Sequence, residues 1–229
     1  MKHAFFDLDE TLHDKRATLT CVSQVMHEHF DLHSRCSEND FRHAFVVENE
    51  IIQPRSTVFT NLRNRLGLTD SANSLQQYFD EHFHLHCKPF KGAIECLKWL
   101  KEIGMTVCCI TNGRDFFQRN KIQGLGITDL LDVIVTSGET GIKKPDHGIF
   151  SIALEKIKAN PEDSFYCGDN EISDIVPANE MGLTTIRKMG KESCITEANY
   201  SFNHFHEFVE IIRCLTSDHI GAPDGARWI

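Results

Sequence analysis

The sequence lacks the features of a membrane-spanning or nucleic-acid-binding protein. No apolar run among its 229 residues reaches the ~18 residues that cross a bilayer. It also lacks an excess of basic residues, because 24 Lys and Arg stand against 33 Asp and Glu, giving a net charge of −9. Nucleic-acid polymers and anionic membrane surfaces both attract basic proteins. We therefore expect neither as a partner.

The sequence also lacks the cysteine spacing of a redox or metal-binding motif. The nine Cys include no C-x-x-C pair, which is typical of reduced thiols in the cytoplasm rather than of a disulfide framework. The first residues lead into an apolar run without a signal-peptide cleavage pattern, so we expect a cytoplasmic location. His82, His84, His86 and Cys87 point in different directions on a helix, so we interpret them as a polar surface and leave open any further role.

Two periodicities divide the chain. An apolar run over residues 3–8 predicts a buried strand. From residue 15 to residue 89 apolar residues recur at helical spacing, and beyond that point helices and strands alternate. Later strands are expected at 105–111, 132–136, 164–167 and 183–186, and helices at 91–103, 115–125, 146–157, 172–181 and 205–215.

This alternation predicts an α/β fold with a Rossmann-like parallel sheet covered by helices. We expect an α/β catalytic core made of residues 1–14 and 90–216. An all-helical cap, residues 15–89, interrupts this core after its first strand. The tail, residues 217–229, is rich in Gly and Pro and is expected to be disordered.

Polar side chains gather where the predicted strands end. In chain order they are Asp7 and Asp9, Thr111 and Asn112, Lys143 and Lys144, and Asp169 and Asp174. Because the carboxyl ends of parallel strands meet at one edge of a sheet, these side chains should share a pocket. The four carboxylates would repel one another without a cation, and carboxylate oxygens suit Mg²⁺.

Such a pocket is suited to phosphoryl transfer. A lysine, backbone N–H groups and Mg²⁺ stabilise phosphoryl charge. One aspartate can attack phosphorus, while a second protonates the leaving oxygen and then activates water. Each motif alone is weak evidence for a catalytic site, since acids at strand ends are often turn residues or helix caps. Four motifs in this order carry the prediction, although the residues alone do not decide between Lys143 and Lys144.

The four motifs resemble those of the haloacid dehalogenase superfamily, subfamily I. They read FFDLDETL at 5–12, ITNG at 110–113, KKPD at 143–146 and CGDNEISD at 167–174. The resemblance covers the core, residues 1–14 and 90–208, whereas the insertion matches a type-one helical cap only by position and length.

The resemblance implies a role for each motif residue. Asp7 would be the nucleophile and a Mg²⁺ ligand, and Asp9 the general acid and base, with its backbone carbonyl on the metal. Thr111 and the backbone N–H of Asn112 would bind the phosphoryl group. Lys144 would neutralise the phosphoryl charge. Asp169 would bind Mg²⁺, and Asp174 would bind it through water or position the lysine.

The acid at position 9 implies phosphatase rather than dehalogenase activity, since dehalogenases of this superfamily lack it. DETLHD and KKPDHGIF resemble the nucleotidase-like branch, so the expected substrate is a small phosphorylated metabolite, a nucleoside monophosphate or a sugar phosphate. A phosphosugar mutase is one alternative, although mutases usually have Gly where Glu10 stands. A catalytically inactive relative that binds a phosphorylated ligand or a protein partner is another, although no motif acid is missing.

The cap should set substrate specificity. Arg42 and Arg63 are candidate substrate-binding residues, since a cationic lid suits an anionic ester. Most exposed cap cations are nonetheless solvated side chains on helix faces. The identity of the ester stays open, and the expected assembly is a monomer or a homodimer.

Overall fold

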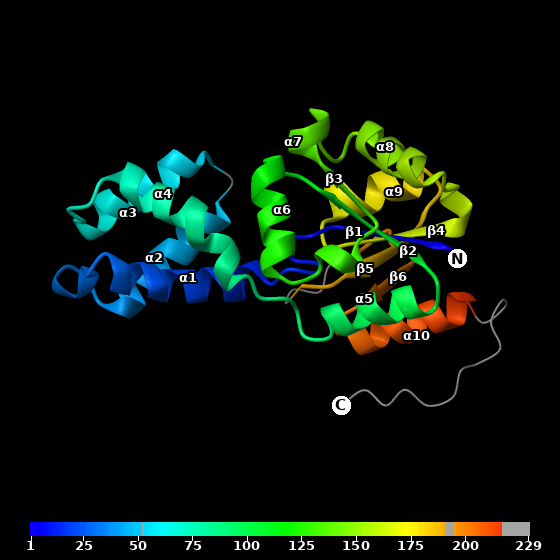
Figure 1. Ribbon diagram of the computed structural model, residues 1–229, viewed down its shortest axis with the longest axis horizontal. Helices are drawn as coiled ribbons and strands as arrows, with labels where there is room; N and C mark the ends of the chain where they lie inside the picture. The colour runs from blue at the N-terminus through cyan, green and yellow to red at the C-terminus, as the bar shows by residue number, and fades with distance from the viewer. Residues whose placement is uncertain (52, 191–194, 217–229) are drawn as a thin grey trace.

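A six-stranded parallel sheet forms the centre of the molecule. The computed structural model describes residues 1–51, 53–190 and 195–216. The strands run in the order β3-β2-β1-β4-β5-β6, all of them parallel (Figure 1). Their bounds are β1 His3–Phe6, β2 Thr106–Thr111, β3 Val133–Thr136, β4 Ser164–Gly168, β5 Thr184–Lys188 and β6 Tyr200–Phe202.

Helices bury both faces of this sheet, as a parallel sheet requires. Side chains alternate along β1: Phe6 joins a cluster with α5 (Ala93–Glu102) and α10 (Phe205–Thr216) on one face. Phe5 packs on the opposite face with α8 (His147–Ile157) and α9 (Val176–Glu180). Shorter elements complete the core, namely α6 (Asp115–Gly124), α7 (Ser137–Thr140), η3 (Thr128–Leu130), η4 (Pro161–Asp163) and η5 (Glu171–Ile175).

A helical unit lies to one side of the sheet (Figure 1). It contains α1 (Lys15–His29), η1 (Leu32–Ser34), α2 (Glu38–Glu50), α3 (Arg55–Leu66), α4 (Ala72–His82) and η2 (Phe83–His86). Side chains of Asp14, Ser37 and Ser71 accept backbone N–H bonds at the starts of α1, α2 and α4. Gly67, with φ of 61°, ends α3 in the left-handed conformation that a side chain would strain.

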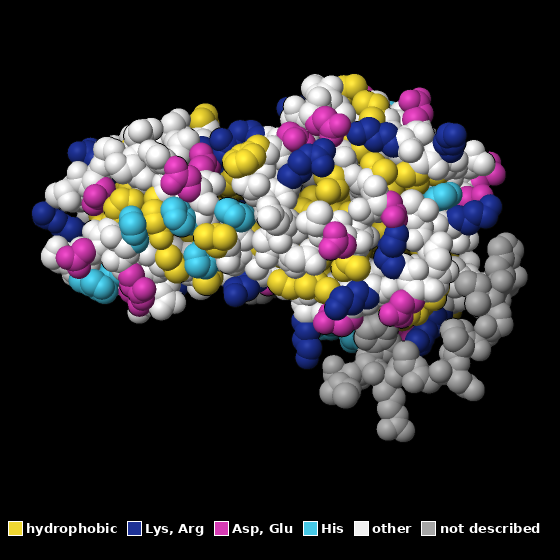
Figure 2. Space-filling view, viewed as in Figure 1, with side chains coloured by type: hydrophobic (Ala, Val, Ile, Leu, Met, Phe, Trp, Pro, Cys, Tyr) yellow, Lys and Arg dark blue, Asp and Glu magenta, His cyan; other side chains and the backbone are white. Residues whose placement is uncertain are grey.

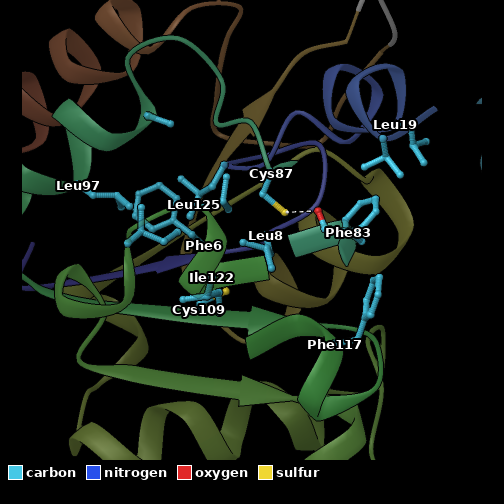
Figure 3. Packing of buried hydrophobic residues seen from close by; sticks show 14 of the residues in the cluster. Phe6, Leu8, Leu19, Phe83, Cys87, Leu97, Cys109, Phe117, Ile122 and Leu125 are labelled. Carbon is cyan, nitrogen blue, oxygen red and sulfur yellow. Dashed lines mark hydrogen bonds between the residues drawn. The ribbon is translucent and has the colours of Figure 1, made fainter. Parts of the chain in front are cut away.

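Two short segments join this helical unit, here called the cap, to the core. Leu12 accepts a backbone bond from Phe90, and Asp14 donates one to Lys88, so the two connections run side by side. Phe83 of the cap packs on Phe117 of α6, with ring centroids 5.3 Å apart (Figure 3). Aromatic packing and the ion pair of Arg114 with Asp80 therefore join cap and core, in addition to the two connections.

The structure confirms the α/β class but differs from the expected elements in detail. The helix expected at 172–181 is the π-helical turn η5 followed by α9. The sequence predicts neither β6 nor α7. Tyr200 and Ser201 of β6 are exposed and lack an apolar pattern, and α7 is a four-residue helix without a buried residue. The predicted disordered tail, 217–229, lies outside the described residues. None of the helices in the described ranges is long and apolar enough to cross a bilayer.

Phe208 tests the packing under the sheet. Its fully buried ring contacts four others, those of Phe6, Phe165, Phe202 and Phe205. Phe208→Ala should lower the free energy of unfolding by ~3–5 kcal/mol, because it loses this burial and leaves a cavity. Urea unfolding followed by circular dichroism measures the change. Phe116→Ala, at a side chain that is 71% exposed, is the control and should change stability by at most ~0.5 kcal/mol.

Candidate active site

The predicted polar residues lie where the strand order reverses. Strands β2 and β3 extend the sheet from one side of β1, and β4, β5 and β6 extend it from the other. In open parallel sheets, ligands bind at the carboxyl ends of the strands at this point. Asp7 follows β1 directly, and its backbone N–H donates to the carbonyl of Cys167 on β4 at 2.9 Å. The nucleophile candidate is thus fixed between two central strands.

Lys144 is the centre of a buried ionic cluster. Its Nζ donates to Asp7 Oδ1 at 2.5 Å, Asp174 Oδ1 at 2.6 Å and the Tyr166 hydroxyl at 2.9 Å. The residue is 4% exposed. Burial by itself lowers the pKa of this ammonium group, but Asp174 and Asp7 outweigh it, so the pKa of Lys144 is raised. Lys143 is exposed, so the structure brings Lys144 into the site.

The Asn112 side chain holds the Lys144 backbone in place. Its amide donates to the Lys144 carbonyl, and its Oδ1 accepts from the Lys144 N–H, both at 2.9 Å. This pair of bonds ties the loop after β2 to the loop before α8. The predicted contact between the Asn112 backbone N–H and a phosphoryl group remains a prediction.

Three carboxylates form what we call the acidic triad: Asp7, Asp169 and Asp174. One oxygen from each lies within 4.8 Å of the others. Burial, together with neighbouring aspartates, raises the pKa of Asp7 well above its usual value and that of Asp169 to about 6. A bound divalent cation would reverse both shifts. The donor set contains only oxygen, as Mg²⁺ prefers, so the residues present fit this metal.

Gly168 lets Asp174 approach the triad. A Cβ at position 168 would lie 2.6 Å from the Cβ, Cγ and Oδ2 of Asp174. Asp174 Oδ2 also accepts the Asn170 backbone N–H at 3.0 Å. The glycine of the fourth motif is therefore a steric requirement, because any side chain there would displace the carboxylate that holds Lys144.

The Asp9 side chain lies apart from the triad. Lys121 Nζ donates to its two oxygens at 2.8 and 2.6 Å, and His13 Nδ1 lies 2.7 Å from Oδ1. Burial raises the pKa of Asp9, but Lys121 and His13 outweigh it and hold the pKa well below its usual value. Gln118 Nε2 donates to Asp9 and to the Thr111 hydroxyl, and so joins these two predicted residues. Coordination of a metal by the Asp9 carbonyl stays a prediction.

The cap residues nearest this network are not those selected from the sequence. Arg42 donates to Asn39, and Arg63 donates to the carbonyl of Asp70, so both contacts stay within the cap. The structure does not bring either to the acidic residues. Instead, the guanidinium of Arg55, on the cap, lies 5.4 Å from the centre of the Phe117 ring, beside Gln118. Arg55 lies outside the four motifs. It follows Pro54 at the start of α3, and no sequence pattern distinguishes it from the other cap arginines.

The sequence did contain a signal for two of the missed residues. Gln118 and Lys121 lie on the buried face of α6 with Phe117 and Ile122. A lysine and a glutamine in an apolar stripe need polar partners, and Asp9 is that partner. The histidines at 82–86 do not form a metal-ligand group with other described residues. Among the described residues, the acidic triad is the one group of three or more His, Cys, Asp or Glu side chains that meet, and histidines gather instead on the cap surface (Figure 2).

Comparisons with known proteins show the family of this chain. The model of the haloacid dehalogenase-like hydrolase family matches residues 4–188. The chain belongs to this family. Family membership agrees with the resemblance that the four motifs indicated.

Several relatives of this chain are named as phosphatases. Glyceraldehyde 3-phosphate phosphatase of Methanocaldococcus jannaschii is 27% identical, covering 95% of this chain and 100% of the relative. Pyrimidine 5′-nucleotidase YjjG of Escherichia coli is 28% identical, covering 79% of this chain and 83% of the relative. A putative beta-phosphoglucomutase of Thermotoga maritima superimposes with a TM-score of 0.75 over 94% of this chain and 100% of that one, at 17% identity, which shows a shared fold.

Gly168→Ala tests the steric role of this glycine. The new Cβ should push Asp174 away from Lys144, and small displacements in such sites cost roughly 10²-fold in rate. The measurement is kcat for hydrolysis of an aryl phosphate. Gly190→Ala is the control, since a Cβ there meets no atom of the described residues within 4 Å. Equal rates for both variants would show that the position of Asp174 does not matter for turnover.

Proposed function

We propose that this chain is a Mg²⁺-dependent phosphatase that hydrolyses a small phosphomonoester through an aspartyl-phosphate on Asp7. The supporting observation is that two aspartates, two residues apart, lie in separate environments. Asp7 contacts Lys144 and lies within 4.8 Å of the other triad acids, whereas Asp9 contacts Lys121 and His13. The relatives, named as phosphatases of small esters, support the same chemistry.

The first step forms a bond between Asp7 and phosphorus. A carboxylate oxygen of Asp7 attacks, the ester P–O bond breaks, and the leaving oxygen takes a proton from Asp9. Lys144 neutralises charge on the phosphoryl oxygens, and Thr111 with the backbone N–H of Asn112 orients them. Mg²⁺ held by the acidic triad would neutralise further charge on the phosphoryl oxygens. To supply the proton, Asp9 must be protonated, which requires that its side chain leave Lys121 and His13.

The second step hydrolyses the aspartyl-phosphate. Asp9, now a carboxylate, accepts a proton from water as the water attacks phosphorus and the bond to Asp7 breaks. Contacts with Lys121 and His13 favour this ionised form, since they lower the pKa of Asp9. The observed arrangement therefore suits the base role, and the acid role needs a different side-chain position. A nucleoside monophosphate or a sugar phosphate is the proposed substrate.

Metal dependence follows from the charge of the triad. Activity should vanish in EDTA and return with Mg²⁺, because the triad carboxylates and a phosphoryl group repel one another without a cation. Ca²⁺ should replace Mg²⁺ poorly, since its looser coordination positions the phosphoryl group less strictly. Phosphate release from p-nitrophenyl phosphate measures this. Full activity in EDTA would contradict a metal-dependent reaction.

Two variants separate the proposed roles of the carboxylates. Asp7→Asn should have background activity, because it cannot form the covalent intermediate. Asp9→Asn should lose ~10²–10⁴-fold with an alkyl ester, whose leaving oxygen needs a proton. With acetyl phosphate and Mg²⁺, Asp9→Asn should still phosphorylate Asp7 but hydrolyse the intermediate slowly. Intact-protein mass after an acid quench should show one phosphate adduct.

Asp7→Asn is the matched control for the adduct, because it removes the proposed nucleophile and leaves Asp169 and Asp174, the other proposed metal ligands, in place. It should carry no adduct under the same conditions. Wild-type activity in Asp7→Asn would rule out a covalent mechanism through this residue. Conversion of a sugar phosphate to its isomer without phosphate release would instead indicate a mutase.

A further inference from the structure

Two cap cations meet on one buried asparagine. Lys15 Nζ donates to the backbone carbonyl of Asn49 at 3.0 Å, and Arg55 Nη1 donates to its Oδ1 at 2.7 Å. Asn49 is 6% exposed. In the described parts of the chain, neither cation has a carboxylate within 4.0 Å. Their positive charges are therefore held close together without an ion-pair partner.

Neighbouring cations, by contrast, are paired. Lys121 has Asp9 at 2.6 Å, and Arg114 has Asp80 at 2.9 Å. Burial lowers the pKa of both Lys15 and Arg55, so holding their charges in this region has a cost. An anion placed between them would offset that cost.

Aromatic rings hold the Arg55 side chain toward the core. Its guanidinium lies 4.4 Å from the centre of the Phe79 ring and 5.4 Å from that of Phe117. Phe117 lies beside Gln118 on α6 and packs 5.2 Å from Lys121 Nζ, and these two polar residues hold Asp9. Burial is the largest effect on the pKa of each cation; against it, Asp80 and then Asp9 raise the pKa of Arg55, and Asp9 and then Glu10 raise that of Lys15. Both cations start cap helices, Lys15 on α1 and Arg55 on α3, and Arg55 contacts the Phe117 ring of the helix that holds Asp9.

This position matches the path of a leaving group. An ester bound with its phosphorus at Asp7 places its leaving oxygen by Asp9, so the rest of the alcohol extends toward the cap. We propose that Arg55 and Lys15 bind a second anionic group, a carboxylate or a phosphate, on the alcohol part of the substrate. This inference rests on the proposed function. Such a subsite would favour phosphorylated acids and bisphosphates over phosphate esters of uncharged alcohols as substrates.

A matched series of substrates tests the preference. Glycerol 3-phosphate, glyceraldehyde 3-phosphate, 3-phosphoglycerate and glycerol 1,3-bisphosphate share a three-carbon chain and differ in the end group. Ribose 5-phosphate and ribonate 5-phosphate test a longer reach. The wild type should have a higher kcat/KM for the substrates with an anionic end group than for those with an uncharged end group. Comparing 3-phosphoglycerate with glycerol 1,3-bisphosphate then shows whether the subsite favours a carboxylate or a phosphate. Phosphate release is the readout.

Variants separate recognition from a structural role. Arg55→Met should lower kcat/KM for the favoured anionic ester by about 10- to 100-fold, as expected for lost charge-assisted hydrogen bonds, mainly through KM. It should change the value for its uncharged counterpart and for p-nitrophenyl phosphate less than about threefold. Lys15→Met should act in the same direction, and Arg55→Lys should restore part of the loss. Arg65→Met, at an exposed residue of the same helix, should behave as wild type.

Each outcome has a distinct meaning. Failure of the wild type to release phosphate from any ester, including p-nitrophenyl phosphate, overturns the proposed function. Hydrolysis without preference for the anionic members, or equal losses on all substrates in Arg55→Met, overturns the second-anion subsite alone. If Arg55→Met unfolds, the Arg55→Lys variant and the wild-type preference still decide the question, since the subsite requires both the preference and a KM effect on anionic esters.

Discussion

The site depends on one buried ammonium group. Lys144 has almost no contact with solvent, and its charge is balanced by Asp7 and Asp174. A buried cation is tolerable only when its partners are close and hydrogen-bonded. Several otherwise unrelated features provide this closeness: the Asn112 amide holds the Lys144 backbone, and the absence of a side chain at Gly168 lets Asp174 approach. The parallel sheet supplies the edge at which these loops meet.

Two carboxylates near the end of one strand are separated by their surroundings. Asp7 lies among other acids, which together with burial raise its pKa, so it favours a cation beside it. Asp9 lies against Lys121 and His13, which lower its pKa and keep it ionised. Environments that separate the protonation of two acids are a means by which enzymes assign them different roles. Here the difference arises because one side chain faces the triad and the other faces α6.

The cap contributes to the same site through its contact with α6. Phe79 and Phe83 pack against Phe117, and the Arg55 guanidinium lies over two of these rings. His13 connects the other end of the network, since its Nε2 lies 2.8 Å from Thr18 Oγ1, which accepts the Lys88 backbone N–H. The residues around Asp9 therefore contact both connections between cap and core, and a leaving group bound there would touch the cap.

The sequence by itself determined the alternation of strands and helices, the helical insertion and the four strand-end motifs. These are local patterns: apolar periodicity sets each element, and parallel strands bring their carboxyl ends together whatever the loops contain. Residue patterns alone left Lys143 and Lys144 open; the motif resemblance selected Lys144, and the tertiary structure buries Lys144 in the site and leaves Lys143 exposed. Only the tertiary structure turned Asp9 toward Lys121 and placed Arg55 rather than Arg42 or Arg63 near the site. Lys121 is 112 positions from Asp9, and contacts over such distances depend on how helices pack, which periodicity does not encode. The short strand β6 and the π-helical turn η5 also depend on neighbouring elements rather than on a local signal.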